Sequence, residues 1–229
     1  MHNDQRLDLL KAVLFDLEGN LVESAYQKSP EILGRLRKET KEKLLSLGVP
    51  RENLSGVVRS SILRNRSYQW ADENLAGKEK ARLRAEVEAF MRPYDMSSAR
   101  RTVLYHDTVD ALSLLLDRGI VMGIVTNTSA AAADYILTNL GLSRFFRTVV
   151  SRSDAPRLKP DPAMIHLAAS RLQMDVGWLV GDSAFDAEAA YKAGLRFILI
   201  RRDGAYPDFE HDFFIKSLEE VPPIVLRYS

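Results

Sequence analysis

Short apolar runs, separated by longer segments of mixed character, recur along this chain. Apolar runs of this length between helix-breaking residues predict buried β-strands. Five such runs are present, at residues 12–15, 120–125, 147–151, 177–180 and 196–200. Three of them lead into a polar side chain, at Asp16, at Thr126 and, after Gly181, at Asp182. The polar side chains therefore follow strands that are far apart in the sequence.

The segments between these runs have the pattern of helices. Their predicted ranges are residues 109–116, 130–140, 162–172 and 186–193. Pro162 suits the first turn of a helix, and Gly141 and Gly194 suit the position just after a helix end. Strands that alternate with helices predict a Rossmann-like α/β fold, with a parallel sheet covered on both faces. Such sheets bind ligands at the carboxyl ends of their strands, so we expect the polar side chains to meet there.

Residues 22–101 interrupt this alternation. The segment is rich in Arg, Lys, Glu, Leu and Ala, and it is predicted to form several helices and no strand. The helical pattern is clearest at 40–47 and 78–90, and Pro93 marks a break. We therefore expect two domains: a core made of 1–21 and 102–229, and an inserted α-helical cap made of 22–101.

Composition narrows the possible functions. A hydrophobic content of 46% fits a soluble globular protein, and a net charge of +1 gives no overall attraction to nucleic acid or to membranes. The absence of cysteine excludes disulfides, thiol catalysis and thiolate metal ligands. No apolar run approaches the roughly 20 residues that span a bilayer, and the polar first ten residues do not resemble a signal peptide. The default expectation is a cytoplasmic protein.

Four short motifs supply candidate chemistry. They are residues 15–20 (FDLEGN), 125–128 (VTNT), 158–162 (LKPDP) and 181–186 (GDSAFD). They deliver a carboxylate, a hydroxyl, an ammonium and a pair of carboxylates. These groups suit a nucleophile, a phosphate clamp and a site for a hard divalent cation. Each motif alone is weak evidence, whereas all four in one order are specific.

In these motifs the chain resembles the haloacid dehalogenase superfamily over residues 12–200. The stretch from 145 to 162 is similar to the helical-cap subfamily that includes phosphoglycolate phosphatase. The resemblance implies an enzyme, a phosphatase that forms an aspartyl-phosphate on Asp16. It implies that Thr126 binds the phosphoryl oxygens, that Asn127 orients the substrate and that Lys159 neutralises negative charge.

The same resemblance implies a Mg²⁺ site. Its ligands would be the carboxylates of Asp16, Asp182 and Asp186 and the backbone carbonyl of Glu18. The implied partner is a small phosphorylated metabolite, such as a phosphoglycolate-like compound or a sugar phosphate. Neither nucleic acid nor a membrane is an expected partner, and the protein is expected to be a monomer or a homodimer.

Glu18 is the main departure from the family pattern. Phosphatases of this family have Asp at this position, where it serves as general acid and then as general base. Glu has the same chemistry but is one methylene longer, and Asn20 also replaces a usual Thr. Three outcomes are open: Glu18 acts as the acid and base, the protein binds phosphate without useful turnover, or it is a haloacid dehalogenase. Thr126 and the Asp182/Asp186 pair argue against a dehalogenase, because binding of phosphate and of a metal ion needs these residues more than carbon–halogen hydrolysis does.

Two further sets of residues leave alternatives. Arg59, Arg64 and Arg66 form a basic cluster within residues 22–101. The cluster is either a solvated helix face or the source of an Arg that binds an anionic substrate tail. Asp107, followed by Thr108, has the pattern of a helix N-cap.

Overall fold

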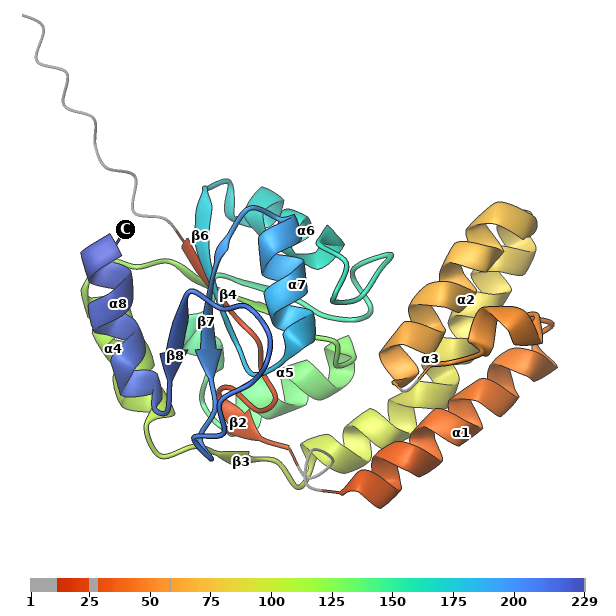
Figure 1. The fold of residues 1–229 in the computed structure, drawn as a ribbon, viewed down its shortest axis with the longest axis horizontal. Coiled ribbons are helices and arrows are strands. Elements are labelled where there is room, and N and C mark those ends of the chain that lie inside the picture. Colours follow the sequence, from red (N-terminus) through yellow and green to blue (C-terminus); the bar gives the residue numbers. More distant parts are fainter. Residues whose placement is uncertain (1–11, 25–28, 58, 229) are drawn as a thin grey trace, which may run out of the picture.

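The computed structural model describes residues 12–24, 29–57 and 59–228, and it contains a six-stranded parallel sheet (Figure 1). The strand order is β5-β4-β1-β6-β7-β8. The strands are β1 (Ala12–Phe15), β4 (Met122–Val125), β5 (Thr148–Val150), β6 (Val176–Gly181), β7 (Arg196–Ile200) and β8 (Phe213–Ile215). All five neighbouring pairs are parallel, as the alternation of strands and helices predicted.

Helices cover both faces of this sheet. Helices α4 (Thr108–Asp117), α5 (Ala130–Asn139) and α8 (Val221–Tyr228) pack on one face, and α6 (Ala163–Leu172) and α7 (Ala184–Lys192) on the other. Successive side chains of β1 alternate between two apolar clusters, with Val13 and Phe15 in one and Ala12 and Leu14 in the other. This alternation follows from strand geometry, and it explains why the strands are apolar throughout. The Rossmann-like α/β class is confirmed.

Three α-helices, with the short 3₁₀ helix η1 (Arg51–Leu54) between the first two, form the described part of the helical insert between β2 and β3. They are α1 (Pro30–Ser46), α2 (Ser60–Asn74) and α3 (Gly77–Ala99), and they lie together beside the α/β part (Figure 1). They share an apolar cluster of their own that includes Leu44, Leu63 and Val87. The insert joins the sheet through β2 (Val22–Glu23) and β3 (Val103–Leu104), which pair antiparallel. The division into domains at 22 and 101 stays a prediction.

Several local expectations were wrong. Residues 22–101 contain a strand, β2, which is only two residues long. It forms because the two connections between the sheet and the helical insert run side by side in extended conformation and pair with each other. Helix α3 continues through Pro93, where packing of neighbours such as Met91 offsets the lost backbone hydrogen bond. Strand β8 and helix α8 were not predicted.

The two remaining expectations concern the membrane and the N-terminus. In the described part of the chain, no helix has both the length and the apolar character needed to cross a membrane. The first ten residues, on which the expectation of no signal peptide depends, lie outside the described residues.

Candidate active site

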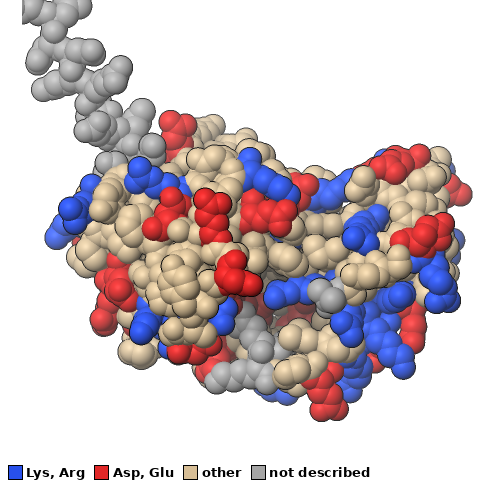
Figure 2. Space-filling view, in the orientation of Figure 1, with Lys and Arg blue, Asp and Glu red and all other residues tan. Residues whose placement is uncertain are grey.

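The predicted site residues line one cavity of about 1030 Å³ at the carboxyl ends of the strands. The seven are Asp16, Glu18, Thr126, Asn127, Lys159, Asp182 and Asp186. Asp16 follows β1 and Asp182 follows β6, the strand beside it, so the sheet brings these carboxylates together. Side chains of the helical insert, including Leu36 and Met91, form other walls of the cavity. Figure 2 shows a hollow between the two parts, with Lys and Arg side chains at its edge.

Lys159 is a buried cation in the lining of this cavity. Its ammonium lies 2.8 Å from Asp16 Oδ1 and 2.5 Å from Asp186 Oδ1, and it donates to the Val125 carbonyl at 2.9 Å. Burial alone lowers the pKa of Lys159, but Asp16 and Asp186 outweigh it and hold the pKa above its ordinary value. Lys159 is therefore a fixed positive charge beside Asp16.

Three carboxylates form a cluster that can hold a metal ion. Ligand oxygens of Asp16, Asp182 and Asp186 lie within 4.8 Å of one another. Burial raises the pKa of Asp16 to about 7 although Lys159 lowers it, and burial, Asp186 and Asp16 raise the pKa of Asp182. Gathering three carboxylates at one place costs free energy unless cations offset their repulsion. An all-oxygen donor set of this charge fits Mg²⁺.

Asp186 is held firmly by its own helix. Its Oδ2 accepts from the Ser183 backbone N at 3.1 Å and from the Ser183 hydroxyl at 2.5 Å, within a capping box at the start of α7. Gly181 provides the space, because a Cβ there would lie 2.7 Å from the Cβ and Cγ of Asp186. The capping box leaves Asp186 Oδ1 directed at Lys159.

The residues after β4 support the loop that carries Lys159. Asn127 Oδ1 accepts from the Lys159 backbone N at 3.1 Å, and its Nδ2 donates to the Lys159 carbonyl at 3.3 Å. Thr126 is buried, and its hydroxyl accepts from the Thr128 backbone N at 3.3 Å. The geometry thus gives Asn127 a positioning function, and its predicted contact with substrate stays a prediction.

Glu18 is anchored by hydroxyl groups. It accepts from the Thr128 hydroxyl at 2.5 Å and also bonds Ser24, which in turn lies 3.0 Å from the hydroxyl of Ser98. Burial raises the pKa of Glu18, and the bonds from Thr128 and Ser24 lower it, with a net rise. Sequence reasoning missed Thr128 as a partner, although it lies within the second motif. Ser24 and Ser98 connect Glu18 to the two ends of the helical insert.

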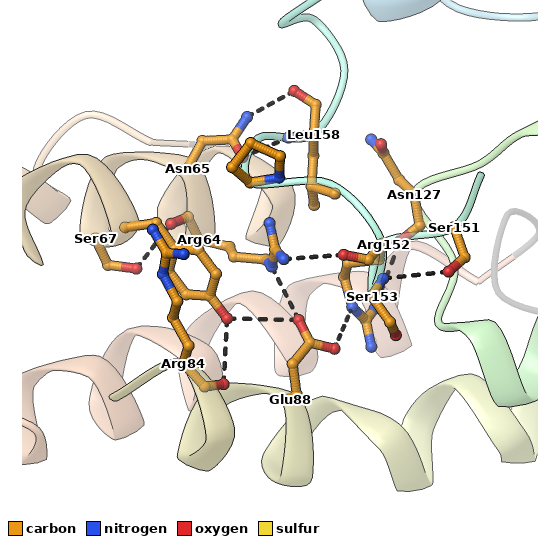
Figure 3. Close-up of polar contacts among 12 residues, drawn as sticks. Arg64, Asn65, Ser67, Arg84, Glu88, Asn127, Ser151, Arg152, Ser153 and Leu158 are labelled. Atoms are coloured by element: carbon orange, nitrogen blue, oxygen red, sulfur yellow. Dashed lines mark hydrogen bonds and ion pairs between the residues drawn. The ribbon is translucent and has the colours of Figure 1, made fainter. Parts of the chain in front are cut away.

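Arg152 joins the α/β part to the helical insert, and sequence reasoning gave no signal for it. Its guanidinium is buried and donates to Glu88 at 3.0 Å and to both oxygens of Asp95, all on α3. Glu88 lies between Arg152 and Arg64, which donates to it at 3.0 Å (Figure 3). Asn65 exchanges two hydrogen bonds with the Leu158 backbone, beside Lys159. The insert is thereby docked on the loop that carries Lys159.

The basic cluster of the insert separates into three environments. Arg64 is buried against Glu88 and the Tyr68 ring. Arg66 donates to the Ser55 carbonyl at 3.0 Å, away from the cavity-lining residues. Arg59 lines the cavity. Arg66 thus fits the solvated face, Arg64 fits neither alternative, and binding of an anionic substrate tail by Arg59 stays a prediction.

Asp107 occupies the predicted N-cap position of α4, but its side chain makes no capping bond. The carboxylate instead pairs with Arg202 at 2.8 and 2.9 Å and accepts from Ser217 and from the Leu218 backbone N. Arg202 also stacks on Tyr105, with 3.7 Å to the ring centroid. A long-range ion pair has replaced the local cap.

Comparison with known proteins agrees with the four motifs. Residues 13–200 match the family model described as haloacid dehalogenase-like hydrolase. A phosphoglycolate phosphatase from Cereibacter sphaeroides is 30% identical over 221 residues, covering 94% of this chain and 98% of that protein. A phosphoglycolate phosphatase from Salmonella typhimurium is 28% identical, covering 82% of this chain and 80% of that protein.

Solved structures give the same fold. The crystal structure of an HAD phosphatase from Thermococcus onnurineus matches with a TM-score of 0.60 and 26% identity, over 94% of this chain and 97% of that one. A dehalogenase crystal structure matches with the same TM-score at 22% identity, over 95% of this chain and 98% of that one. At that identity the second match shows the fold alone.

Proposed function

Because this chain belongs to the haloacid dehalogenase-like hydrolase family, we propose that it is a Mg²⁺-dependent phosphatase of a small phosphomonoester. Family membership confirms the enzyme class that the motifs predicted. The substrate, the metal and the residue roles are our proposal. The observation that carries it is the buried Lys159 ammonium, 2.8 Å from Asp16 and 2.5 Å from Asp186.

In the first step, the Asp16 carboxylate attacks phosphorus. The bond from phosphorus to the leaving oxygen breaks, and an aspartyl-phosphate forms. Glu18 donates its proton to the leaving oxygen, and the raised pKa of this carboxyl keeps it protonated to higher pH than an ordinary Glu. The alcohol product then leaves.

In the second step, Glu18 acts as a base. It takes a proton from a water molecule that attacks the phosphorus of the aspartyl-phosphate, which releases inorganic phosphate and restores Asp16. Lys159 stabilises the negative charge spread over the phosphoryl oxygens in both steps, and the Thr126 hydroxyl donates to one of them.

Asp16, Asp182 and Asp186 are the side chains that would hold Mg²⁺, together with the Glu18 backbone carbonyl. Bound there, the ion supplies positive charge that offsets repulsion between the carboxylates and the phosphate. Asp186 also accepts hydrogen bonds from Ser183 and pairs with Lys159, so orienting Lys159 is part of its function.

Similarity to phosphoglycolate phosphatases makes a phosphoglycolate-like substrate our first choice, with sugar phosphates next. Phosphate binding without turnover is the second candidate, because Glu18 replaces the usual Asp. Carbon–halogen hydrolysis fits less well, because Asp182 adds a third carboxylate to the two that share Lys159, and this excess of negative charge favours a divalent cation that a dehalogenase reaction does not use.

The test is hydrolysis of p-nitrophenyl phosphate and 2-phosphoglycolate with Mg²⁺ and after chelation by EDTA. We expect turnover that needs Mg²⁺ and that Asp16→Asn abolishes, since an amide cannot attack phosphorus. A folded wild type that binds phosphate but turns over neither substrate would support the second candidate. Full activity in excess EDTA would overturn the metal assignment.

A further inference from the structure

Five cationic side chains line the cavity in the part of the chain that the structure describes. They are Arg59, Arg152, Lys159, Arg201 and Arg202. A cation whose charge no carboxylate of the protein neutralises can bind a second anionic group of the substrate without giving up a partner. The partners of each cation therefore indicate which one is free to bind such a second group.

Four of the five are paired with carboxylates. Lys159 lies between Asp16 and Asp186, and Arg152 between Glu88 and Asp95.

The other two paired cations belong to the loop after β7. Arg202 makes a two-pronged pair with Asp107 at 2.8 and 2.9 Å. Arg201 pairs with Asp203 at 3.5 Å. Each of these four cations thus has a carboxylate partner, and the weakest pair is the exposed one between Arg201 and Asp203.

Arg59 differs from the other four. Among the described residues, no carboxylate forms an ion pair with it. Its guanidinium lies 4.7 Å from the centroid of the Phe185 ring, which belongs to α7 of the α/β part. Phe185 belongs to the same short segment as Asp182 and Asp186, so Arg59 reaches from the helical insert to the rim of the carboxylate cluster.

The surroundings of Arg59 favour binding of an anion. Ser60 and Ser61, which follow it directly, also line the cavity and provide hydroxyl donors. Stacking on Phe185 holds the plane of the guanidinium but uses none of its N–H donors. A planar guanidinium presents these donors in a fork that fits a carboxylate or a phosphate.

We propose, on the basis of the phosphatase function above, that Arg59 binds a second negative charge on the organic part of the substrate. Lys159 and Thr126 take the phosphoryl group at the floor of the cavity, and Arg59 takes a carboxylate or a further phosphate at its rim. The substrate class is thus an anionic phosphomonoester rather than a neutral sugar phosphate. This assignment makes Arg59 the residue that selects the substrate.

The test compares kcat/KM of wild type, Arg59→Gln and Arg66→Gln with Mg²⁺. The three substrates are 2-phosphoglycolate, fructose 1,6-bisphosphate and p-nitrophenyl phosphate, whose organic parts carry a carboxylate, a phosphate and no charge. We expect Arg59→Gln to lose about 10- to 100-fold for a substrate with the charged tail, mainly through KM. Its loss on p-nitrophenyl phosphate should be at least tenfold smaller. Arg66→Gln, on the helix that follows Arg59 but outside the cavity, should match wild type.

The first two substrates distinguish a carboxylate from a second phosphate, and selective loss on either supports the proposal. Equal losses on all three substrates, or no loss on any, would overturn it. To keep the test independent of turnover, 2-phosphoglycolate and phenyl phosphate are titrated calorimetrically into Asp16→Asn with and without Arg59→Gln. If Arg59→Gln weakens binding of 2-phosphoglycolate but not of phenyl phosphate, Arg59 binds the charged tail even if the protein proves not to be a phosphatase. If 2-phosphoglycolate binds equally well with and without Arg59→Gln, the function of Arg59 is refuted and the phosphatase assignment is unaffected.

Discussion

The Glu18 carboxylate and the Thr128 hydroxyl are joined by a hydrogen bond of 2.5 Å across the cavity floor. Glu18 comes from the loop after β1 and Thr128 from the loop after β4, which are neighbouring strands. The longer side chain of Glu, compared with Asp, is thereby fixed at its far end. Under the proposed mechanism, this bond would hold the Glu18 carboxylate in place where phosphatases of the family have Asp.

The first prediction concerns Glu18 as a proton donor. Glu18→Gln should lower kcat/KM for 2-phosphoglycolate about 100-fold or more, because the amide keeps the shape but cannot donate an acidic proton. The loss should be smaller with p-nitrophenyl phosphate, whose leaving group departs readily without a proton. Glu18→Asp is the control that keeps the carboxylate and should remain active. If Glu18→Gln lowers kcat/KM only slightly and equally for both substrates, Glu18 does not protonate the leaving oxygen.

The second prediction concerns the pH dependence that Thr128 sets. Burial raises the pKa of Glu18, and the hydrogen bond from Thr128 opposes that rise. The first step needs protonated Glu18, so the rate falls as pH rises through this pKa. Thr128→Val removes the opposing bond, and the alkaline limb of the kcat/KM profile for 2-phosphoglycolate should move to higher pH. A limb that stays in place or moves to lower pH would contradict this.

The third prediction tests the contact between Gly181 and Asp186. Gly181→Ala should destabilise the protein by about 1–3 kcal/mol, because its Cβ would lie 2.7 Å from Asp186. Moving Asp186 also displaces Lys159, so activity should fall tenfold or more, a rough scale for such displacement. Urea unfolding and kcat measure the two effects. Gly34→Ala, which meets nothing within 4 Å, is the control and should not reduce either.

The fourth prediction concerns the docking of the helical insert. Arg152→Met should destabilise the protein by about 3 kcal/mol, because it leaves Asp95 without its buried cation and leaves Glu88 with Arg64 alone. KM should rise as well, since the cavity needs both parts. Arg157→Gln breaks a more exposed pair with Asp72 at the same interface and should cost less than about 1 kcal/mol. Similar costs for the two variants in urea unfolding would show that Arg152 does not hold the insert.

The fifth prediction concerns Asp107 and acid stability. Burial raises the pKa of Asp107, but hydrogen bonds from Arg202, the Leu218 backbone and Ser217 outweigh it and leave the pKa below its ordinary value. Because the pKa of Asp107 is lower in the folded protein, its ionised carboxylate stabilises the fold at any pH above the ordinary value of about 3.9. This stabilisation is lost as the pH falls through the folded-state pKa. Asp107→Asn should cost about 3 kcal/mol at pH 7. The gap to wild type should narrow below about pH 4, and a gap independent of pH would refute the ion pair.

The sequence by itself determined five of the six strands of the sheet and the position of the site. Local apolar runs specify buried strands, and helices between them require parallel connections. The carboxyl ends of parallel strands meet at one edge, so Asp16, Thr126 and Asp182 had to converge there, as the cavity lining shows. Short strands such as β2 and β8 carry too little pattern to be predicted.

Only the tertiary structure decided which partner each polar side chain takes. Arg59 and Arg64 have similar sequence surroundings, yet one lines the cavity and the other is buried against Glu88. Asp107 has a good capping sequence, yet it pairs with Arg202, which is 95 residues away. Sequence periodicity encodes which face of an element is buried. Which element covers that face depends on how distant segments of the chain pack together. The same packing decides which charged partner a polar side chain has.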